Sequence, residues 1–291
     1  MKPARFEYHA PDTIGEAVTL LAELGEDAKI LAGGQSLIPM LALRLTAFDH
    51  LVDVGRIRDL KGVERGDGRL AIGAGTTEAE VGADAAVGSA VPLLARATPL
   101  IGHFQIRNRG TLGGSIAHAD PAAEYPAVAL ALDAVMEMAS PRGARSIPAG
   151  DFFQGLWTSN MEPDEMLVRV SFPVWAGRTG FAIEEIARRH GDFAIAGATV
   201  GIELESDNRI RRCAMALIGM GPTPERASAA EAAVAGRPID EVDQDELGHL
   251  AVAGLSSVPA DLHGTSDYRK KVGAVMVGRA WAAAREEASR E

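Results

Sequence analysis

The sequence predicts an α+β protein built from two parts, and three observations support this. Short apolar strand patterns alternate with helical repeats up to about residue 172. A stretch containing proline and glycine follows at 173–180 and suggests a domain boundary. Beyond it, two strand patterns precede two or three helices, and a sheet followed by helices is typical of an α+β domain. At 291 residues, the chain is long enough for about two domains with separate hydrophobic cores.

Helices are predicted where apolar residues recur at helical spacing behind a capping signal. Thr13 and Glu16 have the spacing of a capping box, and Gly25 is well placed to end that helix. Thr76 or Thr77 is expected to cap a helix that begins near Glu78. The predicted helices span 14–24, 37–45, a segment from about 78, 91–100, 122–134, 226–235, 243–255 and 268–286.

Strands are predicted for short apolar or alternating runs that are bounded by turn residues. The turns at 66–68 and 206–208 consist of glycine, aspartate, serine and asparagine, which favour reversals of the chain. The predicted strands span 28–31, 50–54, 70–73, 135–139, 168–172, 199–204 and 213–218.

Composition and charge exclude several classes of function. The formal net charge of −11 argues against nucleic acid or an anionic membrane surface as the main partner. No run approaches the roughly 18 apolar residues of a membrane span. The first twelve residues lack the apolar core of a signal peptide, so we expect a cytoplasmic protein.

The chain contains a single cysteine, Cys213, in an apolar strand-like run. One cysteine closes no internal disulfide and supplies too few thiolates for an iron–sulfur cluster. We therefore expect Cys213 to be a buried, inert thiol.

Two similar glycine pairs carry most of the functional information. The first lies in Ala-Gly-Gly-Gln-Ser at 32–36 and the second in Thr-Leu-Gly-Gly-Ser at 111–115, each between an apolar stretch and a helix-competent segment. Paired glycines let the backbone approach a ligand closely, and the hydroxyl after them is suited to cap the next helix and donate to an anion. Two such loops predict a clamp on a diphosphate, as in a dinucleotide.

Other glycine-rich strings have a weaker meaning. The segment 73–78 imitates a Rossmann fingerprint, but Glu78 occupies the third glycine position, where a carboxylate repels a pyrophosphate. We therefore predict a tight strand-to-helix turn there. No lysine follows either glycine pair, which excludes a P-loop. Asp120 is predicted to cap a helix that starts at Pro121, and His118 is a candidate for contact with a cofactor edge.

The segment 188–194 gathers two arginines, a histidine and Phe193 at the start of the second part. Two interpretations remain open for it. It is either a solvated turn with arginine–aspartate pairing or a lip over a planar ring, with Phe193 as the apolar contact.

Taken together, the strings at 32–37, 106–115 and 191–194 resemble the FAD-binding medium subunits of molybdenum hydroxylases, such as bacterial carbon monoxide dehydrogenase and the flavin domain of xanthine dehydrogenase. The resemblance implies a two-lobed FAD-binding domain of the vanillyl-alcohol-oxidase (PCMH) type over 1–176, with lobes at about 1–57 and 58–176. It also implies a smaller α+β C-terminal domain over 177–286, with a three-stranded sheet plus helices.

The same resemblance implies the cofactor-binding residues. In the first pyrophosphate loop these are Leu31, Ala32, Gly33, Gly34, Gln35, Ser36 and Leu37. In the second loop they are Thr111, Gly113, Gly114 and Ser115. Glu124 matches an acid that binds the adenosine ribose, and Ile101, Leu167 and Phe193 match positions along the flavin. No catalytic acid or base and no metal ligand is expected in this chain.

By resemblance, the chain holds FAD noncovalently within a multi-subunit enzyme. A large molybdopterin-binding subunit and a small [2Fe-2S] subunit are the implied partners, assembled as a dimer of heterotrimers. Electrons arrive from the iron–sulfur subunit and leave from FAD to an external acceptor. The lone cysteine fits this division, because the clusters then belong to another chain.

Two departures from the family bear on the substrate. Gln35 stands where carbon monoxide enzymes usually carry histidine, and Glu184 and Glu185 stand where some relatives place a lysine near the flavin. Loss of a cation there changes flavin potential. Carbon monoxide is therefore no better supported than a purine, an N-heterocycle or an aldehyde.

Two rival functions remain. One is a self-sufficient flavin oxidoreductase of the vanillyl-alcohol-oxidase type, with FAD tethered through His103 or His118. The other is a noncatalytic scaffold that has lost its flavin, against which the four intact loop glycines argue.

Overall fold

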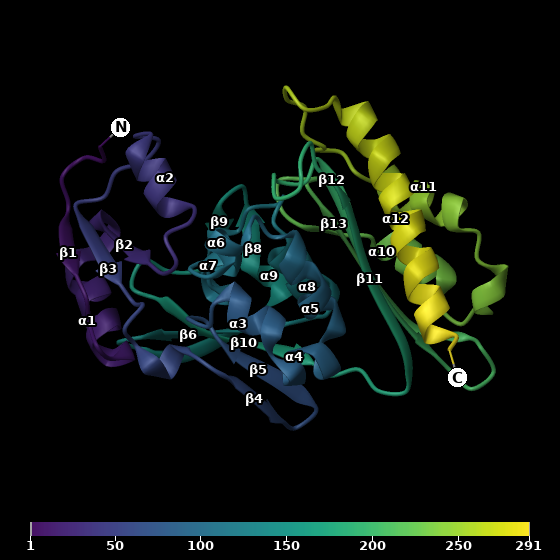
Figure 1. The fold of residues 1–291 in the computed structure, drawn as a ribbon, viewed down its shortest axis with the longest axis horizontal. Helices are drawn as coiled ribbons and strands as arrows, with labels where there is room; N and C mark the ends of the chain where they lie inside the picture. Colours follow the sequence, from purple (N-terminus) through teal and green to yellow (C-terminus); the bar gives the residue numbers. More distant parts are fainter. Residues whose placement is uncertain (1, 291) are drawn as a thin grey trace.

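The computed structural model describes residues 2–290, which form two sheet-and-helix lobes and a C-terminal sheet covered by helices (Figure 1). The first lobe holds a parallel sheet of order β1-β3-β2. Its elements are β1 (Glu7–His9), α1 (Ile14–Leu24), the 3-10 turn η1 (Gly25–Asp27), β2 (Ala28–Leu31), α2 (Leu37–Ala42), β3 (His50–Asp53) and η2 (Arg58–Leu60). The capping box of Thr13 and Glu16 and the helix end at Gly25 are confirmed.

The second lobe is built on an antiparallel sheet of order β4-β5-β10-β6-β7. Its strands are β4 (Val63–Gly66), β5 (Arg69–Gly73), β6 (Val135–Ser140), β7 (Gly143–Pro148) and β10 (Met166–Pro173), beside a ribbon of β8 (Phe153–Gly155) and β9 (Thr158–Ser159). Its helices are α3 (Glu78–Ala83), α4 (Ala85–Ala90), α5 (Pro92–Ala97), the 3-10 turn η3 (Thr98–Leu100), α6 (Phe104–Arg107), α7 (Leu112–His118), α8 (Glu124–Ala131) and α9 (Ala149–Phe152).

The C-terminal part consists of an antiparallel sheet of order β11-β12-β13-β14 covered by helices. Its elements are β11 (Arg178–Ile186), β12 (Ala196–Leu204), β13 (Ile210–Ile218), β14 (Glu225–Arg226), α10 (Ser228–Val234), the 3-10 turn η4 (Ile239–Glu241), α11 (Gln244–Ala253) and α12 (Ser266–Ala288). The predicted α+β class is confirmed. Three strands are long, and the two-residue β14 adds a fourth that was not predicted.

The stretch at 173–180 is not simply a linker, because β11 already begins at Arg178. Gly180 lies so close to α12 that a Cβ atom there would stand 2.7 Å from the backbone nitrogen of Ala288. The glycine that suggested a flexible boundary therefore serves to bring a strand and a helix into contact.

Two sets of contacts fix the C-terminal part against the second lobe. Every residue of α8 is buried, and its Ala127, Leu130 and Ala131 pack against Ala216 and Ile218 of β13. A helix that is apolar on all sides requires cover on all sides. On another side, Arg96 of α5 bonds to both carboxylate oxygens of Glu287 at 2.5 and 2.6 Å, and it also donates to the carbonyl of Phe181.

Three local predictions have clear outcomes. Thr77 caps α3 in a capping box with Glu80, so the strand-to-helix turn at 73–78 is confirmed. The predicted cap by Asp120 is wrong, because its side chain accepts from the N–H of Ala122 in a turn while α8 begins only at Glu124. Cys213 is buried and its thiol is free, as predicted. No helix among residues 2–290 is both long and apolar enough to cross a bilayer.

Candidate functional site: a cleft between the two glycine loops

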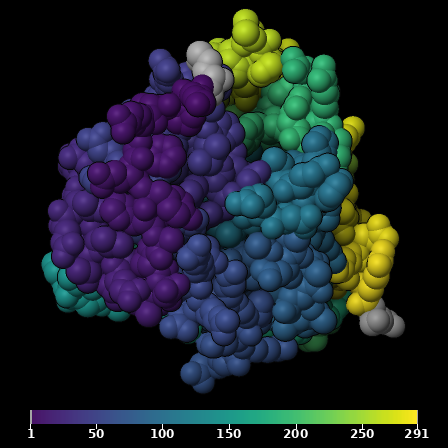
Figure 2. Space-filling model, turned by 60° about the vertical axis from the view of Figure 1, so that its left-hand side comes forward, coloured from purple at the N-terminus to yellow at the C-terminus, as the bar shows by residue number. Residues whose placement is uncertain are grey.

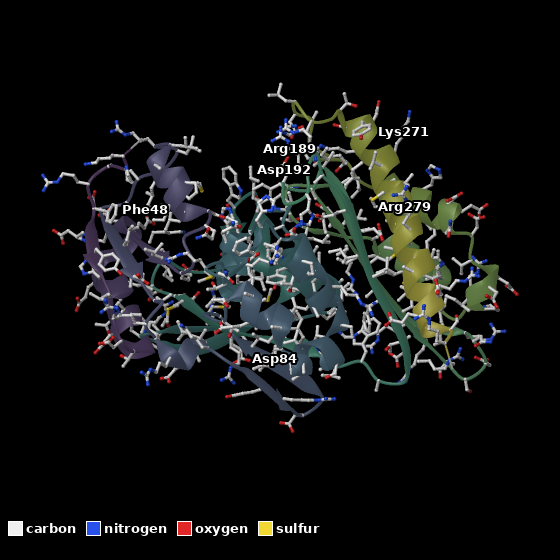
Figure 3. The ribbon with its side chains drawn as sticks, viewed as in Figure 1. Phe48, Asp84, Arg189, Asp192, Lys271 and Arg279 are labelled. Atoms are coloured by element: carbon white, nitrogen blue, oxygen red, sulfur yellow. The ribbon has the colours of Figure 1, made fainter. Side chains whose placement is uncertain are left out.

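A cleft of about 740 Å³ runs between the lobes and reaches the C-terminal part. Both glycine loops line it, Phe48 of the first lobe faces it from one side, and Asp192 of the C-terminal part borders it from the other (Figure 3). In the space-filling view, the purple first lobe adjoins the blue and teal second lobe (Figure 2). Every predicted cofactor-binding residue lines this cleft except Leu31, which lines a second cavity of about 660 Å³ that shares Thr111 and residues 32–35 with the cleft.

The two glycine loops lie in direct contact. A Cβ atom on Gly33 would stand 2.7 Å from the Cα atom of Gly110, just ahead of the second loop. Only glycine permits this approach, since real Cβ atoms require more space. Gly33 thus joins the two lobes at the cleft.

The first loop presents its backbone amides without protein partners. Within residues 2–290, the N–H groups of Gly33, Gly34, Gln35, Ser36 and Leu37 donate to no protein acceptor. Gly34 has a left-handed φ of +72°, and the side-chain amide of Gln35 donates to the carbonyl oxygen of Gly33 at 2.9 Å. Successive unpartnered N–H groups at a bend in the backbone form an anion-binding concavity.

The second loop uses its amides inside the protein. The N–H groups of Leu112 and Gly113 donate to the carbonyl oxygens of Thr76 and Ala74 at 3.0 and 2.9 Å. Gly114 donates to Oγ1 of Thr111 at 3.0 Å. A Cβ atom on Gly113 would stand 2.7 Å from the Cα atom of Ala74, so this glycine is needed for packing against the strand-to-helix turn.

The predicted capping by the hydroxyl after each glycine pair is wrong. Thr111, which precedes the second pair, caps α7, and Ser115 lies within the first turn of that helix. Ser36 occupies the N-cap position of α2 but makes no capping hydrogen bond within the described chain. The second helix begins inside the glycine pair itself, which its sequence did not reveal.

Two buried carboxyl groups, those of Glu78 and Glu124, and the half-buried Glu185 have raised pKa values. Burial raises the pKa of Glu78 to about 7, and its Oε2 atom has no protein partner among the described residues. Burial, reinforced by the charge of Glu185, raises the pKa of Glu124 to about 8. Burial also raises the pKa of Glu185 to about 7. Neither Glu184 nor Glu185 lines the cleft, although Glu185 lies close enough to Glu124 to influence its charge.

His118 and Trp157 form a stacked pair at the cleft wall. Their ring centroids are 6.1 Å apart with an interplanar angle of 11°, and the Trp157 indole donates to Asp120 at 3.1 Å. Burial lowers the pKa of His118 despite the opposing charge of Asp120. His118 therefore remains a candidate for contact with a ligand, whereas His103 is exposed and does not line the cleft.

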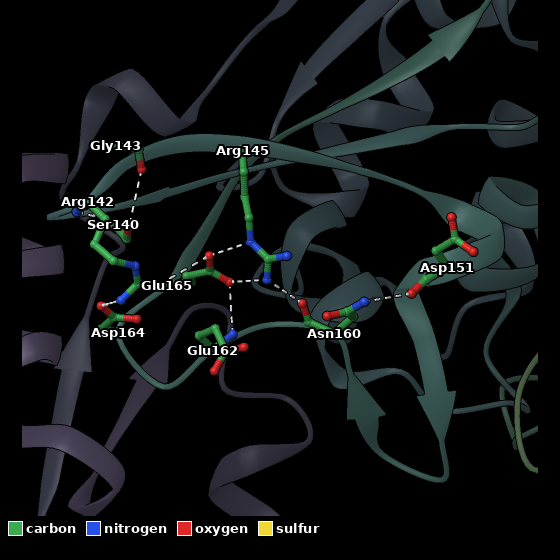
Figure 4. Close-up of polar contacts among 9 residues, drawn as sticks. All are labelled: Ser140, Arg142, Gly143, Arg145, Asp151, Asn160, Glu162, Asp164 and Glu165. Atoms are coloured by element: carbon green, nitrogen blue, oxygen red, sulfur yellow. Dashed lines mark hydrogen bonds and ion pairs between the residues drawn. The ribbon is translucent and has the colours of Figure 1, made fainter.

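One wall of the cleft comes from the segment 157–167, which sequence analysis did not identify apart from Leu167. Figure 4 shows how this segment is held. Arg145 of β7 donates to both oxygens of the buried Glu165 at 2.5 and 2.6 Å and to the carbonyl of Asn160 at 2.7 Å. Although burial alone would raise the pKa of Glu165, these bonds and the N–H of Glu162 lower it. No glycine or motif marks this segment in the sequence.

The loop ahead of β12 closes the cleft from the C-terminal side. Gly191 has a φ of +85°, and a Cβ atom there would stand 2.9 Å from the carbonyl oxygen of Gly102. Phe193 lines the cleft with 64% of its surface exposed, which suits an apolar lip. Arg188 and Asp192 approach to 3.7 Å in an exposed ion pair. The loop thus shows the arginine–aspartate pairing of the first interpretation, and it also places Phe193 on the cleft lining, as the second interpretation requires.

The lining of the cleft combines polar and apolar groups. The first loop offers unpartnered amide donors, Glu124 contributes a buried carboxyl, and Ile101, Leu167 and Phe193 supply apolar surface. A buried carboxyl oxygen with no protein partner, as on Glu78, is also typical of a site completed by a ligand.

Comparison with known proteins gives matches over the whole chain. Residues 4–175 match the family model of the FAD-binding domain in molybdopterin dehydrogenase, and residues 181–284 match the CO dehydrogenase flavoprotein C-terminal domain. The carbon monoxide dehydrogenase medium chain of Hydrogenophaga pseudoflava is 39% identical over 98% of both chains. The 6-hydroxypseudooxynicotine dehydrogenase complex subunit alpha of Paenarthrobacter nicotinovorans is 40% identical, covering 98% of this chain and 96% of the relative.

Solved structures agree with the sequence relatives. A chain of carbon monoxide dehydrogenase from Hydrogenophaga pseudoflava superposes with a TM-score of 0.95 at 41% identity, over 99% of each chain. A chain of quinoline 2-oxidoreductase from Pseudomonas putida 86 gives 0.94 at 36% identity over the full length of both. On the strength of these matches and the cleft between its loops, the chain belongs to the family of FAD-binding flavoprotein subunits of molybdenum-containing dehydrogenases.

Proposed function

We propose that this chain binds FAD noncovalently in the cleft and passes electrons from an iron–sulfur partner subunit to an external acceptor. The observation that carries the proposal is the row of unpartnered amides from Gly33 to Leu37 in a loop that lines the cleft together with the second loop. Bound FAD supplies the redox chemistry, and the protein supplies binding and orientation. The proposed division of the chain remains 1–176 for the FAD-binding domain and 177–286 for the C-terminal domain.

Each part of the cleft has a separate proposed task. The amides of the first loop hold the diphosphate, with the hydroxyl groups of Thr111 and Ser115 opposite them. Glu124 exchanges hydrogen bonds with the ribose hydroxyls. Ile101, Leu167 and Phe193 pack along the flavin and exclude water. No side chain of this chain acts as a general acid or base in the proposal.

The direct test compares two glycines with nearly equal φ angles. Gly34 lies in the first loop with φ +72°, whereas Gly68 lies in the β4–β5 turn with φ +71° and does not line the cleft. Alanine at either position costs about 1–2 kcal/mol of stability through the same left-handed strain. We expect Gly34→Ala to bind FAD at least about tenfold more weakly, which corresponds to about 1.4 kcal/mol or more, and to lose flavin during purification.

Flavin content is read from the absorption spectrum of the purified chain, and stability from thermal unfolding. Gly68→Ala serves as the control and should stay fully yellow. Normal flavin content in Gly34→Ala would reject the proposed diphosphate site. A colourless wild-type protein would instead favour the noncatalytic scaffold.

The self-sufficient flavin oxidoreductase is the second candidate, and the position of His118 at the cleft wall keeps it testable. Acid precipitation separates the two. Free flavin in the supernatant supports noncovalent binding, and flavin that remains with the pellet supports a tether to protein.

The partners are proposed from the names of the relatives. The names "medium chain" and "complex subunit alpha" both imply further chains. We therefore propose a large molybdopterin-binding subunit, a small [2Fe-2S] subunit and a dimer of heterotrimers. Purification from the native source tests this through the copurifying chains and their metal content. Isolation of the chain alone with full dehydrogenase activity would refute it.

A further inference from the structure

Three side chains with metal-binding atoms meet on the first lobe, away from the residues that line the cleft. Glu7 and His9 lie on β1, and His50 lies on the neighbouring β3. The register of the parallel pair places Glu7 opposite His50. Residues two apart on a strand share a face, so all three side chains project from the same face of the sheet.

The distances between these atoms suit one small cation. His9 Nε2 and His50 Nδ1 are 3.1 Å apart, and His50 Nδ1 lies 3.6 Å from Glu7 Oε2. All three ligand atoms lie within 4.8 Å of one another. Zinc bonds of about 2.0–2.1 Å in tetrahedral geometry separate neighbouring ligand atoms by about 3.3 Å. The His9–His50 and His50–Glu7 separations lie on either side of that value, and the exposed Glu7 side chain is free to approach His9 more closely.

The chemistry of the three ligands selects the metal. Two imidazoles and one carboxylate suit zinc and similar divalent transition metals, whereas calcium and magnesium prefer sets made only of oxygen ligands. We infer that Glu7, His9 and His50 form a zinc site with three protein ligands and a fourth position open to solvent.

The position of the site gives it a structural consequence. β1 is a three-residue edge strand that, among residues 2–290, pairs only with β3. β3 also pairs with β2, which leads directly into the first glycine loop. A metal bound by β1 and β3 therefore links the N-terminal strand to the sheet from which the first glycine loop extends. The metal itself does not contact the residues of that loop.

Zinc titration of the full-length flavin-containing chain, after removal of metals with EDTA, tests the inference. We expect one Zn²⁺ per chain, with affinity at least tenfold weaker in His50→Gln and in His9→Gln. His249→Gln is the matched control, because His249 is exposed on α11 away from this site. Zinc should also raise the thermal unfolding temperature of the wild type and of His249→Gln, but not that of His50→Gln.

The fold of each variant is checked by circular dichroism and flavin content. Because Glu7 is exposed, Glu7→Gln provides a ligand variant that keeps the sheet intact, and its zinc affinity should also fall. Wild-type protein that takes up no zinc overturns the inference. Equal zinc affinity in the wild type and in all three ligand variants overturns it as well, because it would place the metal elsewhere.

Discussion

The two glycine loops have nearly the same sequence but opposite uses of their backbone. The first loop leaves the amides from Gly33 to Leu37 without protein partners, and the second commits those of 112–115 to the protein. Gly34 permits a left-handed bend, whereas Gly113 permits contact with the adjacent strand-to-helix turn. Similar strings therefore do not form a symmetric clamp. The first loop is suited to binding, and the second is suited to packing with its hydroxyls toward the cleft.

The largest effect is expected from Gly113→Val. Its side chain would overlap Ala74, so we expect a loss on the order of 4 kcal/mol in the free energy of unfolding. Gly15→Val is the control, because Gly15 holds the same second position in α1 with nothing within 4 Å of its Cβ site. Chemical denaturation measures both. Equal stability of the two variants would remove the packing role assigned to the second loop.

The buried carboxyl of Glu124 should give a pH-dependent effect. Since the pKa of Glu124 rises from 4.5 unfolded to about 8 folded, its contribution to stability is full below pH 4.5 and is lost as pH rises through 8. In the flavin-free chain, Glu124→Gln should match wild type near pH 5. At pH 9 its free energy of unfolding should exceed that of wild type by on the order of 4 kcal/mol, because a pKa difference of one between the folded and unfolded states corresponds to about 1.4 kcal/mol.

The measurement is denaturant unfolding of the flavin-free chain at several pH values. Glu23→Gln, at an exposed position of α1, should follow the wild-type curve throughout. A constant difference between Glu124→Gln and wild type from pH 5 to pH 9 would contradict the raised pKa.

A smaller effect is expected from Thr111→Val. The change removes the hydroxyl that caps α7 and accepts from Gly114, which should cost about 1 kcal/mol. Thr265→Val removes the equivalent cap of α12 and should cost a similar amount. Only Thr111→Val should also weaken flavin binding, as measured by flavin titration of the apoprotein. If both variants bind flavin with the same affinity, the Thr111 hydroxyl does not contribute to flavin binding and its role is limited to capping α7.

The smallest effect is expected from Gln35→Leu in the first loop. Its side-chain amide holds the carbonyl of Gly33, and a net hydrogen bond of about 1 kcal/mol corresponds to roughly fivefold weaker FAD binding. Gln154→Leu loses a similar bond to Asp151 away from the cleft and should bind FAD normally. Unchanged FAD affinity in Gln35→Leu would show that the amides hold their arrangement without this bond.

Sequence reasoning was most successful where a signal is local. The capping boxes at Thr13 and Thr77 and the strands β12 and β13 of the last sheet are visible in a few neighbouring residues, whereas β11 was not identified. The meeting of the two glycine loops was anticipated from their similarity, and Gly33 now accounts for it physically.

What the sequence did not reveal depends on long-range contacts. The wall at 157–167 is held by Arg145, and no spacing rule links that arginine to Glu165. Nor does the sequence distinguish a glycine that admits a ligand from one that admits a neighbouring strand. The roles of Gly34 and Gly113 differ only through what lies opposite each of them.

The ion pair between Arg96 of α5 and Glu287 of α12 has a consequence for biosynthesis. Residues 191–193, the lip of the cleft, connect β11 to β12, and both strands pack against α12. Arg96 and Glu287 fix that helix to the second lobe. In the sequence, α12 follows both glycine loops by more than 140 residues. Because the N-terminal parts of a chain leave the ribosome first, both glycine loops are made before the helix that supports the strands on either side of the lip. A chain that ends before α12 would keep both loops and lack this support for the third side of the cleft.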